Sequence, residues 1–410
     1  MTQRLYYNDS YLVSFHARVV AVDPADEPGL YRVILDRTAF YPESGGQPAD
    51  GGTIAGHPVT GVTEQDDQVV HLVRLEATIA QSLVGQEVEG AIDWPRRLDH
   101  LQQHAGQHLL SAAFEQLYDA DTIGFHLGDE EVTIDLTLDE LTVEAAKAAE
   151  RRVNQVVLEN RPIRVRWADP EEAAGLPLRK RPERAGTLRL IEVEGFDLNA
   201  CGGTHPRRTG EVGLVKIIGW ERMRRQVRVR FFCGWRALSD YSLKNEIVAG
   251  LVATLAVPAV QLRDEAARLQ ESLAAADREL RQLRQELLAA EAAALLAGAS
   301  SNPAGLRVLV RRWEGREAGE LRLLAQMTLK EATSTIVVFG SVQAEKAHLV
   351  LGRSNDLELD VRPALNAALA LVEGRGGGPP ALAQGGGPAT GRLNEALEAA
   401  RRLLPGEGQE

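Results

Sequence analysis

Three histidines follow one another at intervals of four residues in the segment DHLQQHAGQHLL. Because four residues are slightly more than one helical turn, His100, His104 and His108 would lie along one stripe of a helix. Two imidazoles on adjacent turns can bind one metal ion, and a neutral histidine nitrogen is a common zinc ligand. The helical zinc-protease pattern H-E-x-x-H is excluded, because Ala105 follows His104 where that pattern has glutamate. Taken alone, the histidines are more typical of solvated or capping positions than of a metal site.

A second reactive segment, LNACGGTHPRRTG, contains Cys201 and His205, which are separated by two glycines and a threonine. A thiolate and an imidazole at this spacing can bind the same ion where the chain turns sharply, and glycine permits such a turn. The alternative for Cys201 is a structural cysteine buried in a core. Together with the histidine pair, the segment predicts a tetrahedral zinc site with the ligands His104, His108, Cys201 and His205. His100 could replace one of these ligands, and otherwise we expect it beside the site or on the surface.

The composition is that of an ordinary water-soluble protein, with 44% hydrophobic and 25% charged residues among 410. The net charge of −12 lowers the expectation of nucleic-acid binding without excluding a local basic patch. Two cysteines make a disulfide framework unlikely and suit a reducing compartment. The most apolar segment, Ile247–Val260, is shorter than the roughly 20 residues of a membrane span and is interrupted by Pro258. We therefore expect a cytoplasmic protein that does not enter a membrane.

The segments that position the reactive residues indicate a multidomain α+β chain with four domains. Residues 1–90 consist of short alternating or apolar runs between turn residues, which is typical of a small β-barrel. Residues 91–240 are expected to form the zinc-binding α+β domain, with helices over Arg96–Tyr118 and Val143–Asn160. The strands expected after these helices are Ile163–Trp167, Leu188–Val193, Gly213–Ile218 and Gln226–Phe232.

Residues 241–300 are expected to form a helical coiled-coil arm. From Leu262 to Ala290, apolar residues follow the alternating four- and three-residue spacing of a heptad seam. The alternative is a single amphipathic helix that lies on its own domain. Residues 301–410 alternate strand-like and helical runs and predict a C-terminal α/β domain, within which GRGGGPPALAQGGGP, residues 374–388, has the composition of a linker.

The two reactive segments together resemble a known family. HAGQHLL followed by CGGTH resembles the editing domain of alanyl-tRNA synthetase and of its free-standing relatives, the AlaX proteins. FYPESGGQPADGG, residues 40–52, resembles the glycine-rich motif of the family's N-terminal β domain, and IGFHLGDEEVTIDL and TGEVGLVKIIGWERMRRQVRVRF resemble its editing-domain segments. The C-terminal part resembles the DHH-associated domain. Since no segment resembles the synthetase's ATP site, the closest resemblance is to the long form of AlaX. The sequence departs from the family pattern at Ala105, where threonine is frequent, and at Pro379-Pro380, where Arg-Pro is frequent.

The resemblance implies a zinc-dependent trans-editing deacylase that hydrolyses the ester of serine or glycine with tRNA(Ala). Zinc could activate a bound water, polarise the carbonyl or only orient the substrate. Four protein ligands are more usual in a structural site, whereas a catalytic site keeps one position open. No carboxylate at helical spacing from the histidines is identified as a general base. The alternative is a non-catalytic tRNA-binding protein with a structural zinc.

The resemblance also implies substrate-binding residues. Thr122 stands where the family places a polar side chain near the amino acid, and His126 is a second candidate. We expect the backbone of Gly45, Gly46 and Gln47 to line the entrance of the zinc cleft, where amides can donate hydrogen bonds. The alternative for Thr122 is an ordinary turn residue, and for the glycines a wide turn without a ligand.

Two basic runs are candidates for contact with tRNA phosphates. One is ERMRRQVRVRF, with Arg222, Arg224, Arg225, Arg228 and Arg230, and the other is LRKRPER, residues 178–184. The alternative for each is a solvated strand edge. By resemblance, the C-terminal domain also binds the tRNA body, and a homodimer is possible through the helical arm or the C-terminal domain.

Overall fold

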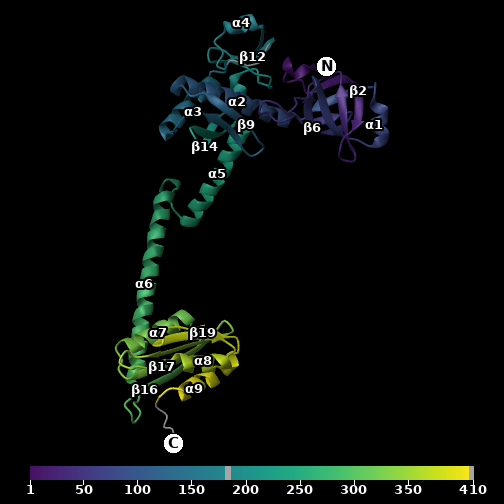
Figure 1. Cartoon of the computed structure of the whole chain (residues 1–410). Coiled ribbons are helices and arrows are strands. Elements are labelled where there is room, and N and C mark those ends of the chain that lie inside the picture. Colours follow the sequence, from purple (N-terminus) through teal and green to yellow (C-terminus); the bar gives the residue numbers. More distant parts are fainter. Residues whose placement is uncertain (181–185, 406–410) are drawn as a thin grey trace. The chain divides into compact units, whose positions relative to one another are not determined.

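The computed structural model describes residues 1–180 and 186–405. The chain divides into two compact units, Met1–Thr254 and Leu255–Glu410 (Figure 1). Both units combine helices with sheets, which confirms the predicted multidomain α+β fold. The finer division into four domains stays a prediction.

Six strands at the N-terminus pair in the closed order β2-β3-β7-β6-β5-β8 and form a small barrel. They are β2 (Ser14–Pro24), β3 (Leu30–Leu35), β5 (Gly52–Ile54), β6 (His57–Gln65), β7 (Gln68–Arg74) and β8 (Glu87–Ile92). Phe15, Ala17 and Val19 of β2 are buried while the residues between them are exposed, as the two-residue period of a strand requires. The first strand, β1 (Gln3–Arg4), pairs with β4 (Arg37–Thr38) outside the barrel sheet. Helix α1 (Ala77–Leu83) precedes β8.

The central part of the first unit, residues 93–233, is built on helix α2 (Trp94–Tyr118). The side chain of Asp93 caps α2 by accepting a hydrogen bond from the Arg96 amide, and Asp119 ends it with a left-handed φ of 52°. Every residue from His100 to Phe114 is buried, so the polar side chains among them need partners inside the protein. The observed helix agrees with the predicted one to within two residues at its start.

Two sheets and one long helix surround α2. The four-stranded antiparallel sheet has the order β14-β15-β10-β9, and a three-stranded sheet has the order β11-β12-β13. The elements are β9 (Thr122–Leu127), β10 (Val132–Leu136), α3 (Val143–Leu158), β11 (Ile163–Ala168), α4 (Pro170–Ala174), β12 (Leu188–Val193), β13 (Asp197–Ala200), β14 (Val215–Met223) and β15 (Gln226–Cys233). One apolar core joins α2, α3 and the larger sheet.

Helix α5 (Gly234–Leu255) follows β15 directly, and most of its residues are exposed. No single helix among the described residues combines the length and apolar character needed to cross a membrane. The pair of α5 and α6 passes that test of length and composition only when the two helices are counted together.

The second unit begins with helix α6 (Leu262–Ala297) and continues as a five-stranded sheet between two layers of helices. The sheet order is β16-β17-β18-β20-β19, where only β16 and β17 are parallel among these strands. Its elements are β16 (Arg307–Glu314), α7 (Ala318–Lys330), β17 (Thr335–Gln343), β18 (Lys346–Arg353), α8 (Arg362–Leu371), β19 (Arg375–Gly377), β20 (Leu382–Gly387) and α9 (Leu393–Arg402). Val337 and Phe339 face the core with α7, whereas Ile336 and Val338 face the core with α8 and α9.

The glycine-rich segment of residues 374–388 is not a linker, and the prediction from its composition was wrong. It forms β19 and β20 inside the sheet. The glycines are needed because other backbone lies against them: a Cβ on Gly387 would be 1.9 Å from the Val372 carbonyl oxygen. A Cβ on Gly385 would be 2.8 Å from Leu369 of α8. Composition indicated flexibility where the structure uses the small size of glycine for packing.

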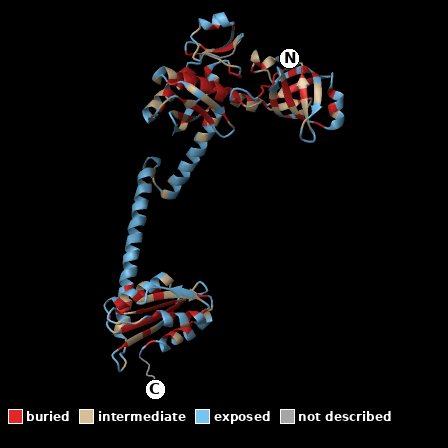
Figure 2. Ribbon diagram, viewed as in Figure 1, coloured by how far each residue is buried: buried red, intermediate tan, exposed pale blue. Residues whose placement is uncertain are grey.

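Helix α6 spans the predicted heptad region, but most of its seam is exposed within this chain (Figure 2). The exposed leucines are Leu269, Leu273, Leu280, Leu283 and Leu287. Only the end of the helix enters the core of its own unit, through Leu288 and Ala292. Pairing of this seam with a partner helix stays a prediction.

Candidate metal centre

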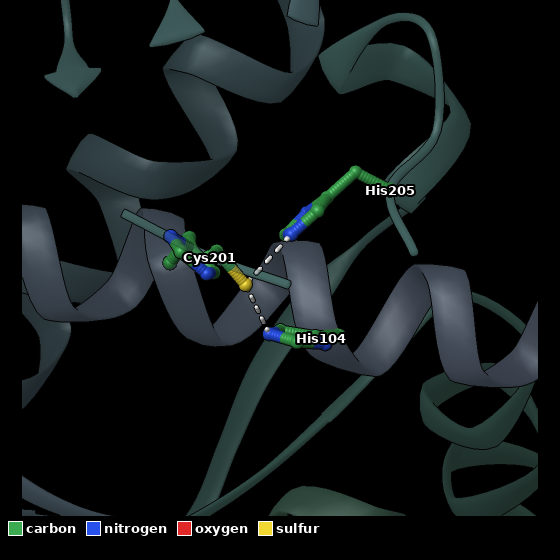
Figure 3. Close-up of side chains that lie close together, drawn as sticks. His104, Cys201 and His205 are labelled. Carbon is green, nitrogen blue, oxygen red and sulfur yellow. Dashed lines mark hydrogen bonds between the residues drawn. The ribbon is translucent and has the colours of Figure 1, made fainter. Parts of the chain in front are cut away.

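Four side chains from two segments meet inside the first unit. His104 and His108 lie on adjacent turns of α2, while Cys201 and His205 lie in the loop that follows β13. Their ligand atoms all lie within 4.8 Å of one another. The Cys201 Sγ is 3.4 Å from both the His104 Nε2 and the His205 Nε2 (Figure 3). Tetrahedral zinc with ordinary bond lengths would separate sulfur and nitrogen by about 3.6 Å, so this donor set fits zinc.

The protonation states within the group also suit a metal. The pKa of the Cys201 thiol lies well below its usual range, because His104 and His205 stabilise the thiolate against the opposing effect of burial. Burial lowers the pKa of His205 to about 3, so this imidazole is neutral. Burial acts in the same direction on His108, but hydrogen bonds to Asp197 and Cys201 outweigh it and raise the pKa to about 9. Thiolate and neutral imidazole are the forms that bind metals, so a metal competes with a proton chiefly at His108.

The loop that carries Cys201 is held by one buried arginine. Arg189 of β12 donates from Nη1 to the carbonyl oxygens of Cys201 (2.7 Å) and Gly203 (2.9 Å). Gly203 is required for space, since a Cβ there would be 2.2 Å from the Cε1 of His104. The Gly203 amide donates in turn to the Cys201 Sγ (3.3 Å). The sequence indicated a glycine hinge, and the structure adds that the His104 ring packs directly on it.

Gln47 connects the barrel to the cluster of three histidines and Cys201. Its side chain is fully buried, and the Oε1 lies 2.6 Å from the Nδ1 of His104. The same oxygen accepts from the Thr204 amide (3.2 Å), and the Nε2 donates to the Thr204 hydroxyl (2.8 Å). Because Oε1 can only accept, the His104 ring must carry its proton on Nδ1 and leave Nε2 free to bind a metal. Gln47 was expected at the entrance through its backbone, and its role behind His104 was missed.

Asp197 has the corresponding position behind His108. Its Oδ2 lies 3.4 Å from the His108 Nδ1, and its Oδ1 accepts from the Arg179 Nε (2.8 Å). Burial acts against ionisation, but the hydrogen bond from His108 and the charge of Arg179 lower the pKa of this carboxyl. A carboxylate behind a histidine ligand orients the ring and increases its basicity. No motif in the sequence indicated Asp197, which stands 89 residues from His108 in the chain.

We expect replacement of Gln47 by leucine to lower the zinc affinity of the protein by about 10- to 100-fold, because an outer-shell partner of a ligand is lost. The measurement is competition for zinc with a chromogenic chelator. A matched control is Gln116 to leucine on α2, whose amide donates to the Phe196 carbonyl oxygen and to none of the four clustered residues. Unchanged zinc affinity of the Gln47 variant would contradict the orienting role.

The barrel loop, residues 40–52, positions Gln47 through close contact with β9. The Gly46 carbonyl oxygen accepts from the Leu127 amide (3.1 Å), so the turn continues the edge of the sheet. Gly46 has a φ of +82°, and a Cβ on it would lie 2.6 Å from the Phe125 carbonyl oxygen. Both the torsion angle and the space therefore require glycine. The centroid of the Phe125 ring lies 5.4 Å from that of the His104 ring, so Phe125 contacts both the Gly46 turn and the histidine cluster.

A buried ion pair joins the barrel loop, residues 40–52, to α2. Arg97 and Asp50 are both fully buried in their side chains, and the Arg97 Nε donates to the Asp50 Oδ1 (2.9 Å). Arg97 also donates to the carbonyl oxygens of Ser10 and Ala39, at 2.7 Å each. The second oxygen of Asp50 accepts from the Tyr41 amide (2.6 Å). The barrel loop and the helix that carries two of the four clustered residues are thus joined by charge-assisted hydrogen bonds.

A pocket of about 280 Å³ opens beside the cluster. Its lining residues include Gly45, His104, Gln107, His108, Thr122, Phe125, Arg179, Lys180, Asn199 and Cys201. Thr122 is one of these lining residues, and its hydroxyl donates to the Ser111 Oγ (2.7 Å). Gly46, Gln47 and His126 line a neighbouring pocket of about 410 Å³ that shares Gly45. His100 lies outside the four-residue cluster and is buried on α2, so of the two places expected for it, beside the site or on the surface, the surface is excluded.

The structure separates the five candidate RNA-binding arginines into two groups. Arg228 is paired with Asp135 (2.8 Å), and Arg230 lies 3.8 Å from Glu131. Arg222, Arg224 and Arg225 surround the tip of the β14–β15 hairpin, without a carboxylate partner among the residues that the structure describes. In the second basic run, Arg179 contacts Asp197 and Lys180 lines the pocket, while residues 181–184 lie outside the described residues.

Comparison with known protein families finds matches to three parts of the chain. A model of class II (A) tRNA synthetases matches residues 2–96, and the model of the threonyl and alanyl tRNA synthetase second additional domain matches residues 188–229. The DHHA1 domain model matches residues 305–405. The C-Ala domain of Aquifex aeolicus alanyl-tRNA synthetase is 27% identical, and the match covers 26% of this chain and 96% of that one with a TM-score of 0.24.

Two curated relatives match nearly the whole chain. Alanine–tRNA ligase of Halorubrum lacusprofundi is 32% identical over 411 residues, which are 98% of this chain but only 44% of the ligase. The alanyl-tRNA editing protein AlaX-L of Pyrococcus horikoshii is 30% identical over 400 residues, which cover 94% of both chains. The order of the matched domains is that of the long form. With this relative aligned from end to end, the chain belongs to the AlaX family of alanyl-tRNA editing proteins, in its long form.

Proposed function

We propose that this protein is a zinc-dependent, trans-editing deacylase that hydrolyses the ester between serine or glycine and tRNA(Ala). The observation that carries the proposal is the cluster of three histidines and one cysteine, of which His104, His108 and Cys201 line a pocket. The chain's membership of the AlaX family supports the choice of tRNA(Ala) as the partner. The proposed place of this activity is the cytoplasm, where aminoacyl-tRNAs are used.

His104, His108, Cys201 and His205 would hold the zinc ion. When bound there, zinc supplies positive charge that polarises an ester carbonyl or positions the reacting groups. Gln47 fixes the proton of His104 on Nδ1, and Asp197 accepts from the Nδ1 of His108, so both rings keep Nε2 for the ion.

The pocket supplies the remaining interactions with the substrate. Lys180 provides positive charge for the 3′ end of an RNA, whereas Arg179 is already paired with Asp197. Phe125 excludes water from the face of His104. Thr122, which lines the pocket, is proposed to contact the aminoacyl group through its hydroxyl. The described lining of the pocket contains no carboxylate, so we assign no side chain as general base.

Further contacts with the tRNA are proposed outside the pocket. Arg222, Arg224 and Arg225 at the hairpin tip are available for phosphates, whereas Arg228 and Arg230 already have acidic neighbours. The DHHA1 part is proposed to bind the tRNA body. The exposed leucines of α6 support a homodimer through this helix, which the mass of the protein in solution tests.

The function is tested by incubating the purified zinc protein with seryl-, glycyl- and alanyl-tRNA(Ala). We expect catalytic release of serine or glycine, little release of alanine, and loss of turnover after zinc is removed with a chelator. Tight binding of all three tRNAs without hydrolysis would instead identify a tRNA-binding protein with a structural zinc, which a closed set of four protein ligands would fit.

A further inference from the structure

We infer that Gln107 determines substrate specificity by accepting a hydrogen bond from the side-chain hydroxyl of a seryl ester, an inference that rests on the proposed deacylase function. Gln107 stands directly before His108 on α2 and lines the same pocket as His104, His108 and Cys201. Only 7% of the residue is exposed. What remains accessible of Gln107 therefore faces the pocket beside the metal centre.

A buried serine fixes the orientation of the Gln107 side chain. The Gln107 Nε2 donates to the Ser111 Oγ at 2.9 Å, one helical turn further along α2. The Thr122 Oγ1 donates to the same Ser111 Oγ at 2.7 Å, although Thr122 belongs to β9. Ser111 is 1% exposed and cannot exchange these partners for solvent. Gln107 and Thr122 are thus held side by side in the pocket wall by one hydroxyl.

This arrangement leaves acceptors facing the pocket. With Nε2 bound to Ser111, the Gln107 Oε1 points the other way, and no donor within the described chain reaches it. The Thr122 hydroxyl has given its hydrogen to Ser111 and keeps lone pairs that can accept. The Gln107 Oε1 and the Thr122 hydroxyl are thus acceptors in the pocket wall, and this wall is complementary to a ligand that donates a hydrogen bond.

Two groups of an aminoacyl ester can donate, the α-ammonium and a side-chain hydroxyl. The pocket favours the hydroxyl, because Lys180 belongs to its described lining and no carboxylate does. The charge of Arg179 is already paired with Asp197, but Lys180 would repel a cationic ammonium, whereas a neutral hydroxyl matches the neutral amide oxygen. Serine has this hydroxyl and glycine lacks it. The contact therefore increases the hydrolysis of seryl relative to glycyl esters.

The test compares the wild-type protein with Gln107→Leu and Gln107→Glu on seryl- and glycyl-tRNA(Ala). We expect Gln107→Leu to lower kcat/KM for the seryl ester by about 10- to 100-fold and to leave the glycyl ester within about threefold. Gln107→Glu retains an acceptor and should keep more seryl activity than the leucine variant. Gln116→Leu on the same helix is the matched control and should leave the ratio of the two substrates unchanged.

Two further measurements separate this role from a structural one. The zinc content of each variant should remain at the wild-type level, and loss of zinc from Gln107→Leu would overturn the inference. An equal loss for both esters would show that Gln107 binds the ammonium or only packs, which also overturns the inference.

If the wild type hydrolyses neither ester, the proposed function fails, and a binding measurement then decides whether the inference about Gln107 holds. Non-hydrolysable seryl and glycyl amides of 3′-amino-3′-deoxyadenosine should bind the wild type with a preference for serine that Gln107→Leu loses.

Discussion

Replacing Cys201 with alanine is expected to abolish stoichiometric zinc binding and, with it, the release of serine from seryl-tRNA(Ala). Cys201 is the only thiolate of the cluster, and its sulfur lies 3.4 Å from two of the three imidazoles. Loss of a direct ligand should exceed the roughly 10- to 100-fold effect of losing an outer-shell partner. Metal analysis of the purified variant and steady-state turnover give the two readouts.

The chain provides a matched control, because its other cysteine is Cys233. Cys233 is buried against Gly106 of α2 and lies outside the cluster. Burial raises the pKa of its thiol, so it is not a metal-binding thiolate at neutral pH. Cys233→Ala should lose some stability and retain one zinc ion. A Cys201→Ala protein that still binds one zinc with wild-type affinity would refute the proposed ligand set.

Replacing Arg97 with methionine is expected to lower the free energy of unfolding of the first unit by about 3–5 kcal/mol. The substitution leaves the Asp50 carboxylate buried without its counter-ion and removes the donors of the Ser10 and Ala39 carbonyl oxygens. Denaturant unfolding followed by circular dichroism measures the change. Because the chain divides into two compact units, the unfolding curve should be fitted with a separate transition for each unit.

The control for Arg97 is the same substitution at Arg37, whose ion pair with Asp36 is exposed. An exposed pair contributes at most about 1 kcal/mol, so Arg37→Met should be nearly neutral. The double variant Arg97→Met with Asp50→Leu removes the unpaired charge and should recover part of the loss. Equal stabilities of Arg97→Met and Arg37→Met would show that the buried pair does not hold the barrel loop to α2.

The features that the sequence predicted are those with local signals. The helix expected over Arg96–Tyr118 matches α2 except for its first two residues, and the β12 bounds Leu188–Val193 agree with the structure. The spacing of the histidine pair, with the two glycines before Thr204 and His205, pointed to the residues that the structure brings together. Each of these signals lies within one element or one short loop.

The contacts that the sequence did not reveal join residues far apart in the chain. Gln47 and His104 are 57 residues apart, and nothing near either residue indicates the other. The same holds for Asp197 with His108 and for Arg97 with Asp50. The linker predicted for residues 374–388 was wrong for another reason. Composition does not distinguish a flexible glycine from one that is needed for close packing, as the glycines of β19 and β20 are.

The position of Gln47 has a thermodynamic consequence. The residue belongs to the barrel loop, yet its amide oxygen holds the ring of His104 on α2. Binding equilibria that share a contact are reciprocal: the factor by which the barrel loop strengthens metal binding equals the factor by which the metal strengthens attachment of the loop. Removal of the metal with a chelator should therefore weaken the attachment of the barrel loop to α2. Proteolysis within residues 40–52 should become faster when the metal is removed.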